Sequence, residues 1–150
     1  IREADYSHIM DINVKAAVAL AKSFCKKGSY REGGSIVLLS SIMGIVGQNA
    51  VSLYSLSKGA LISFVKSLAI EVSAKRIRVN CVAPGLVETE MSQKVQSSLL
   101  IEQVKSIESK HPLGFGLPRD VANAVVFLLA ETGRWITGTT LVVDGGYTAQ

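Results

Sequence analysis

Hydrophobic residues recur with two different periods along this chain. In residues 4–27, apolar side chains return every three or four positions, which is typical of an amphipathic helix. Residues 118–131 open with Pro118 and Asp120, which favour a helix start, and run to Gly133. Residues 35–40 and 77–83 are apolar on successive positions over a short run rich in β-branched side chains, which predicts strands buried on both faces. The pattern therefore predicts helices that alternate with buried strands.

Three further segments complete the series. Residues 53–73 have a helical pattern that is apolar almost all round, which predicts packing against the sheet on one side and a second subunit on another. Residues 92–109 are a more polar amphipathic stretch, and residues 139–146 are a final strand. The order predicts an α/β fold with a parallel sheet and right-handed crossovers.

Composition narrows the class of protein. The 150 residues are 48% hydrophobic and 19% charged, which fits one globular domain with its own core. No run has the roughly 18 uninterrupted apolar residues of a membrane helix, and the first residues lack the features of a secretory signal. A cytoplasmic protein is therefore expected. The net charge of +4 comes from cations interleaved with 12 acids, so no nucleic-acid or membrane surface is predicted.

Several residue types that often carry chemistry have no partner at useful spacing here. Cys25 and Cys81 are expected to be reduced thiols, and no metal site is predicted. His8 and His111 have no carboxylate or thiol nearby in the sequence, and neither is predicted to be functional. Trp135 is expected to be an interface or core anchor.

Tyr54 and Lys58 lie one helical turn apart, on the same face of the predicted 53–73 helix. A phenol is a weak base at neutral pH, and a lysine cation about 4 Å away favours the phenolate by up to about 4 kcal/mol at an effective dielectric of about 20. Such a tyrosine can exchange a proton with a carbonyl or alcohol oxygen. Ser41 follows a strand at the sheet edge where parallel sheets bind ligands, and its hydroxyl can bind the same oxygen. Ser41, Tyr54, Lys58 and the turn at 84–89 are expected to line one crevice.

These residues and their spacing resemble the short-chain dehydrogenase/reductase family. Four motifs occur in the family's order along the chain. They are a strand ending in Ser-Ser, a tyrosine thirteen positions after Ser41, the Tyr-x-x-x-Lys pair and the turn 84-PGLVET-89. The resemblance implies reversible hydride transfer between NAD or NADP and a carbonyl or alcohol carbon. It implies Tyr54 as the general acid/base, Lys58 as a ligand of the nicotinamide ribose, and Ser41 as the group that orients substrate.

The resemblance implies further site residues. The segment 11-DINVKA-16 resembles the family's Asn-containing helix, so Asn13 is implied as a fourth catalytic residue that kinks the helix and holds a proton-relaying water near Lys58. Residues 90–110 correspond to the family's substrate lid. The implied cofactor-binding residues are Tyr54, Lys58, Pro84, Gly85, Val87 and Thr89.

The family also implies partners. We expect a homodimer or homotetramer formed through the helices at 4–27 and 53–73, and a small carbonyl or alcohol substrate. Both a 3-oxoacyl reductase and a sugar or alcohol dehydrogenase fit the motifs. The sequence does not select between them, nor between NAD and NADP.

One family feature is missing from these residues. The glycine-rich loop that holds the cofactor pyrophosphate between a strand and a helix start is not found in residues 1–150. One interpretation is that residues 1–150 are the C-terminal catalytic half of a Rossmann-fold enzyme, with the last three strands of a doubly wound sheet, and that the N-terminal cofactor-phosphate half lies outside them. The other is a truncated, non-catalytic homologue that associates through the exposed edge of the strand at 35–40. The complete catalytic set favours the first interpretation.

Overall fold

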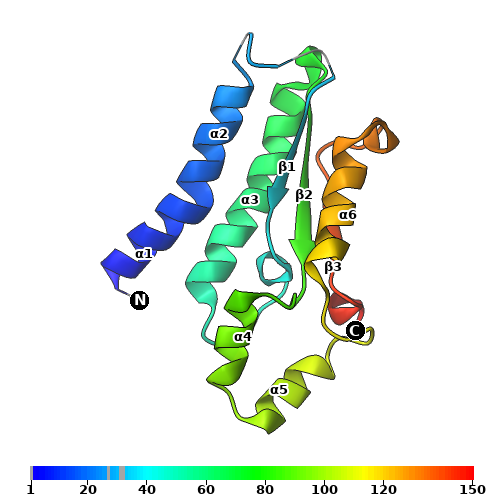
Figure 1. Cartoon of the computed structure of the whole chain (residues 1–150). Helices are drawn as coiled ribbons and strands as arrows, with labels where there is room; N and C mark the ends of the chain where they lie inside the picture. The colour runs from blue at the N-terminus through cyan, green and yellow to red at the C-terminus, as the bar shows by residue number, and fades with distance from the viewer. Residues whose placement is uncertain (1, 27, 31–32) are drawn as a thin grey trace.

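A three-stranded parallel sheet forms the centre of the molecule. The computed structural model describes residues 2–26, 28–30 and 33–150, apart from the side chain at position 95. The strands β1 (Ser35–Leu39), β2 (Arg78–Pro84) and β3 (Thr140–Val143) lie side by side in that order (Figure 1). Their parallel register pairs Ser35 with Arg78 and Cys81 with Thr140. The predicted α/β fold with a parallel sheet is confirmed.

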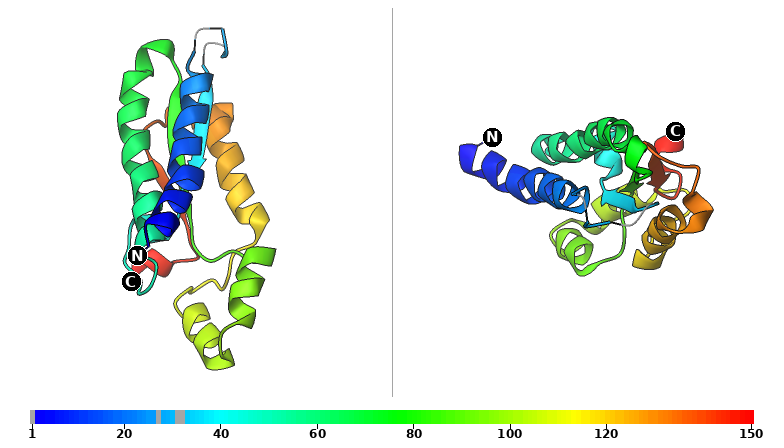
Figure 2. Two further views of the ribbon diagram at one scale, coloured as in Figure 1. Left: turned by 90° about the vertical axis from the view of Figure 1, so that its left-hand side faces the viewer. Right: turned by 90° about the horizontal axis from the view of Figure 1, so that it is seen from above.

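Helices cover both faces of the sheet. Helix α3 (Ser52–Glu71) packs against one face and α6 (Pro118–Leu129) against the other (Figure 2). Residues Ser57, Leu61, Val65 and Ala69 of α3 are buried, four positions apart, so they form one stripe that faces the strands. By length and composition α3 is apolar enough to cross a membrane. Its buried stripe against the sheet is what a core helix of a globular fold shows.

The two strands predicted to be buried on both faces differ in the structure. Every residue of β2 from Val79 to Ala83 is buried, because β2 lies between two strands and between two helical layers. In β1 the prediction is wrong: its residues are only half-buried, and Leu39 is 51% exposed. The reason is that β1 is the edge strand of the described chain, so its outer side has no neighbouring strand there.

The predicted helix at 4–27 is a rod in three parts that lies along α3 (Figure 1). The α-helices α1 (Glu3–Met10) and α2 (Ala16–Phe24) are joined by a π-helical segment, η1 (Asp11–Lys15). The rod ends at Phe24, earlier than predicted, and position 27 lies outside the described residues. The second packing partner of α3 within this chain is therefore this rod.

The stretch predicted as one amphipathic segment at 92–109 consists of two helices, α4 (Glu90–Ser97) and α5 (Ile101–Glu108). Leu100 is extended between them, with φ −70° and ψ 150°, and its N–H donates to the Gln103 side chain at 2.9 Å, which starts the new helix. Both helices project beyond the carboxyl ends of the strands (Figure 1). The short 3₁₀ helices are η2 (Ile42–Gly44), η3 (Ser73–Lys75), η4 (Glu131–Gly133) and η5 (Tyr147–Ala149).

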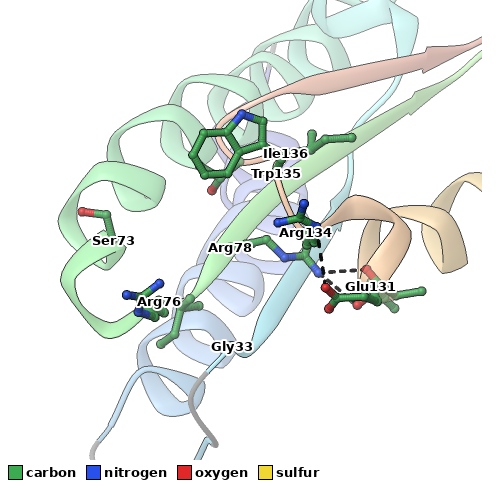
Figure 3. A pocket seen from close by; sticks show the side chains of 12 residues that line it. Gly33, Ser73, Arg76, Arg78, Glu131, Arg134, Trp135 and Ile136 are labelled. Atoms are coloured by element: carbon green, nitrogen blue, oxygen red, sulfur yellow. Dashed lines mark hydrogen bonds and ion pairs between the residues drawn. The ribbon is translucent and has the colours of Figure 1, made fainter.

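A cavity of about 540 Å³ opens at the opposite, amino-terminal edge of the sheet (Figure 3). Arg78, at the start of β2, donates there to the backbone oxygens of Leu128, Leu129 and Ala130. These carbonyls end α6 and have no partner within the helix, so the guanidinium acts as a cap. Arg134 faces Glu131 at 3.8 Å in the same cavity. Arg78 in this cavity therefore stabilises the end of α6.

Candidate active site

Strand β1 ends in two serines that connect three elements. Ser40 donates its N–H to the Val82 carbonyl of β2 at 2.8 Å, and its hydroxyl donates to the Lys58 carbonyl of α3 at 2.8 Å. The neighbouring Ser41 hydroxyl accepts the N–H of Met43 at 3.2 Å and so caps η2. Because Ser40 fixes the strand end to α3, Ser41 is brought to the same helix as Tyr54 and Lys58.

Lys58 is directed toward the sheet edge and lies over the Tyr54 ring. Its Nζ is 5.7 Å from the centroid of that ring and donates to the Leu39 carbonyl at 3.0 Å. Burial lowers the pKa of the Lys58 ammonium below its ordinary value. The Tyr54 side chain is 36% exposed. The predicted proximity of these two side chains is confirmed.

Asn13 lies in the π-helical segment, where the Ala16 N–H donates to the Asp11 carbonyl five residues earlier. The predicted irregularity of the helix around Asn13 is confirmed, and such bulges are frequent at functional sites. The Asn13 amide donates to the Ser57 hydroxyl at 3.0 Å, and Ser57 donates to the Tyr54 carbonyl at 2.8 Å. The Asn13 side chain therefore reaches α3 through Ser57, a residue to which no sequence motif points.

The turn after β2 is held from both sides. Gly85 donates its N–H to the Val143 carbonyl at 3.0 Å and lies against the Asp144 backbone, where a Cβ would come within 2.9 Å. Only glycine fits this close approach, because any other side chain would displace the turn from β3. The turn at 84–89 thus begins directly at the carboxyl end of the central strand, and it contains Pro84, Gly85, Val87 and Thr89.

At Val87 the backbone N–H and C=O of the turn point away from the segment that pairs with it. Val87 pairs with Gly116 in a parallel bridge, made by Gly116 N–H to the Leu86 carbonyl at 3.0 Å and Glu88 N–H to the Gly116 carbonyl at 2.8 Å. Neither bond uses the N–H or C=O of Val87, which in an extended segment point the other way. Thr89 caps α4: its hydroxyl accepts the Ser92 N–H at 3.2 Å and retains its own proton to donate.

The histidines, the tryptophan and the cysteines lie in different surroundings. His111 lies in a loop, as expected, but it is only 4% exposed and its ring bonds two backbone groups. Trp135 is 92% exposed and is not a core anchor of this chain. Cys25 and Cys81 are both free, and burial raises the pKa of the Cys81 thiol. His8 is exposed. Within the described residues, no group of three or more His, Cys, Asp or Glu side chains could hold a metal ion.

The comparisons with known proteins agree with this geometry. Residues 1–148 match the family described as enoyl-(acyl carrier protein) reductase. The 3-oxoacyl-[acyl-carrier-protein] reductase FabG of Rickettsia felis is 40% identical over 147 residues, which are 97% of this chain and 59% of that protein. The chain thus spans less than two thirds of the length of this relative.

Solved structures with the same fold include dehydrogenases with nicotinamide cofactors. A short-chain dehydrogenase family protein from Francisella tularensis has a TM-score of 0.91 and 30% identity, over 100% of this chain and 64% of its own. A 4-hydroxyisoleucine dehydrogenase complexed with NADH has a TM-score of 0.89 and 31% identity, over 99% and 61%. A putative 2-deoxy-D-gluconate 3-dehydrogenase from Agrobacterium tumefaciens with bound NADP has a TM-score of 0.89 and 33% identity, over 100% and 61%. This chain belongs to the short-chain dehydrogenase/reductase family.

Proposed function

We propose that these residues are the C-terminal catalytic half of an NAD- or NADP-dependent oxidoreductase that interconverts a carbonyl compound and an alcohol. The observation that carries the proposal is the position of Lys58, 5.7 Å from the centroid of the Tyr54 ring and fixed to the end of β1. Family membership and relatives with bound NADH or NADP support it. The N-terminal, phosphate-binding part of the fold is expected outside these residues.

The residues present fit a nicotinamide ring and its ribose. Lys58 spends one of its three N–H donors on Leu39, so two donors remain for ribose hydroxyls. The N–H and C=O of Val87 and the Thr89 hydroxyl match the donors and acceptors of a carboxamide. Pro84 and Gly85 start this turn at the sheet edge where α/β folds bind nucleotides.

The proton chemistry follows from the same geometry. A bound nicotinamide supplies or accepts the hydride at its C4. In the reduction, the Tyr54 hydroxyl gives its proton to the substrate carbonyl oxygen, and in the oxidation the phenolate takes it from the alcohol. The Lys58 ammonium stabilises the phenolate, and the Ser41 hydroxyl stabilises the developing charge on the substrate oxygen. Asn13 is joined to the first half of α3 through Ser57, and a water held at Asn13, as the family resemblance implies, would relay protons to Lys58.

Substitution of Tyr54 by Phe in the complete natural polypeptide tests this proposal. We expect turnover of carbonyl substrates with NADH or NADPH to fall by about 10²- to 10⁴-fold, because the acid/base group is removed. The thermal midpoint should stay within a few degrees, since a partly exposed hydroxyl contributes little to stability. Turnover at the wild-type level would refute the role of Tyr54. The substrates to screen are 3-oxoacyl thioesters, sugars and simple alcohols.

We also propose that the protein is a homodimer or homotetramer that associates through the rod of α1, η1 and α2 and through α3. The outer faces of these helices expose large apolar side chains: Ile12 at 59%, Leu20 at 71%, Leu56 at 51% and Ile70 at 74%. Exposed large apolar side chains that gather on one surface mark an interface, and we propose that these four do so. Light scattering of the natural protein at micromolar concentration should give a multiple of the monomer mass, and a monomer would exclude this interface.

The alternative of a non-catalytic association module draws on the open edge of β1. The same edge equally fits completion of the sheet by earlier strands of the same polypeptide. The intact mass of the natural protein distinguishes the two cases. Residues 1–150 alone have a mass of 16.0 kDa, and an enzyme with the further strands would be heavier. A mass close to that value together with absent cofactor binding would favour the association module.

A further inference from the structure

The His111 ring is buried where three functional segments meet. Its Nε2 is 3.3 Å from the backbone nitrogen of Leu86 in the turn after β2, and its Nδ1 is 2.9 Å from the Ile107 carbonyl in the last turn of α5. The ring centroid lies 4.8 Å from that of Tyr147 in the C-terminal segment and 5.4 Å from that of Phe115. One side chain therefore contacts the proposed cofactor turn, the helix at the position of the substrate lid, and the chain terminus.

The partners of the two ring nitrogens assign the tautomer. The Leu86 N–H can only donate, so Nε2 must accept, and the Ile107 carbonyl can only accept, so Nδ1 must carry the proton. A neutral imidazole satisfies both groups. A second proton, on Nε2, would face the Leu86 N–H donor and abolish that bond.

Leu86 is the residue that orients the proposed cofactor turn. Its N–H is held by His111 at 3.3 Å and its carbonyl accepts the Gly116 N–H at 3.0 Å, so both of its backbone groups point toward the 111–116 segment. The next residue, Val87, consequently presents its own N–H and C=O to the opposite side. The acceptor at His111 therefore acts together with the bridge to Gly116 in setting the direction of the Val87 backbone.

We propose that His111 is a positioning residue that, as a neutral imidazole, holds the turn at 84–89 in the conformation that binds the nicotinamide, and links this turn to α5 and the C-terminal segment. This inference rests on the proposed function, since it assigns the turn to the cofactor. Histidine changes charge within the range from about pH 5 to 8. Protonation of His111 would therefore release Leu86 and weaken cofactor binding on acidification.

Charged and titratable groups face the His111 ring from the elements packed against it. The Asp144 carboxylate and the Tyr147 phenol face it from the C-terminal segment. Charged side chains on the other packed elements, Glu88, Glu108 and Lys110, are exposed to solvent, which screens them. Among the described residues, Asp144 is therefore the charged group that faces the ring from a partly buried position.

The charge of Asp144 stays constant over the range in which histidine titrates. Burial by itself would raise the pKa of Asp144, but hydrogen bonds from Thr148 and Gly146, with His111 nearby, outweigh it and lower this pKa below the ordinary value. A pH dependence of the turn between about pH 5 and 8 is thus assigned to the ring and not to this carboxylate.

The test is a fluorescence titration of NADH and NADPH with the complete natural polypeptide at pH 8.0 and 5.5. His111→Phe keeps an aromatic ring but offers no acceptor, and we expect about five- to tenfold weaker cofactor binding at pH 8. The glutamine amide of His111→Gln can accept from Leu86 and donate to Ile107 at both pH values, because it does not titrate between them. This variant should therefore bind more tightly than His111→Phe and lose the weakening that the wild type shows at pH 5.5. His8→Gln, on the exposed face of α1, is the matched control and should behave as the wild type.

The outcomes separate this inference from the proposed function. If the wild type binds neither NADH nor NADPH, the proposed function fails. If the wild type binds a cofactor, and both His111 variants bind it with the affinity and pH dependence of the wild type, the inference alone is overturned. Should His111→Phe fail to fold, the pH dependence of His111→Gln decides, because a merely structural histidine would leave that dependence unchanged.

Discussion

Gly44 lies directly against the backbone of Gly59: a Cβ at position 44 would be 2.9 Å from the Gly59 nitrogen and 2.9 Å from the carbonyl carbon of Lys58. This contact between two backbones seats η2, which Ser41 caps, on the first half of α3. The separation between Ser41 and the Tyr54–Lys58 pair therefore depends on the missing side chain at position 44.

We expect Gly44→Ala to push η2 away from α3. Forced overpacking of this kind costs about 1–3 kcal/mol of unfolding free energy. Turnover of the complete enzyme should fall by about 10- to 100-fold, because a shift of about 1 Å in a positioning element is enough to do so. Denaturant unfolding and steady-state kinetics measure the two effects.

The matched control for this substitution is Gly47→Ala. A Cβ at position 47 meets nothing within 4 Å, so stability should change by no more than about 0.5 kcal/mol. Equal effects of the two substitutions on turnover would show that the Gly44 contact does not set the geometry of the site.

Ser57→Ala tests the link between Asn13 and α3. Ser57 is fully buried and connects the Asn13 amide to the Tyr54 carbonyl. We expect a loss of about 1–2 kcal/mol in stability, since a half-buried amide is left without its acceptor, and a several-fold lower kcat. Ser67→Ala, at an exposed position of the same helix, should leave the stability within about 0.5 kcal/mol of the wild type and kcat unchanged. A fall in stability with unchanged kcat would make Ser57 purely structural.

Lys58→Met separates function from stability. Turnover should fall by about 10²-fold or more, because the phenolate loses its counter-charge. Burial lowers the pKa of Lys58, so the unfolded chain binds the proton more tightly than the folded one. The charged side chain therefore opposes folding at neutral pH, and this penalty is relieved as the pH rises through the folded pKa toward the ordinary value of 10.5.

Unfolding experiments at several pH values check the sign of this effect. The stability of Lys58→Met relative to the wild type should be highest near pH 7 and should decline toward pH 10.5. Lys66→Met, at an exposed position of α3, should show no such trend. A difference between Lys58→Met and the wild type that grows with pH would contradict the assignment of a buried ammonium.

The order of elements and the pair at the centre of the site follow from local patterns. Apolar runs on successive positions predict β1 and β2, three-to-four periodicity predicts the helical rod of α1, η1 and α2, and Tyr54 and Lys58 share a face by helical geometry alone. The cofactor class implied by the sequence agrees with the NADH and NADP bound to structural relatives.

Other features depend on contacts between residues far apart in sequence. Ser57 meets Asn13 across 44 positions, and His111 meets Leu86 across 25, so no window of sequence could reveal either bond. The exposure of Leu39 likewise depends on which strands flank β1. Periodicity fixes the direction of a side chain relative to its own helix or strand, because it arises from backbone geometry. Which distant groups that side chain meets is decided only when the elements pack in three dimensions.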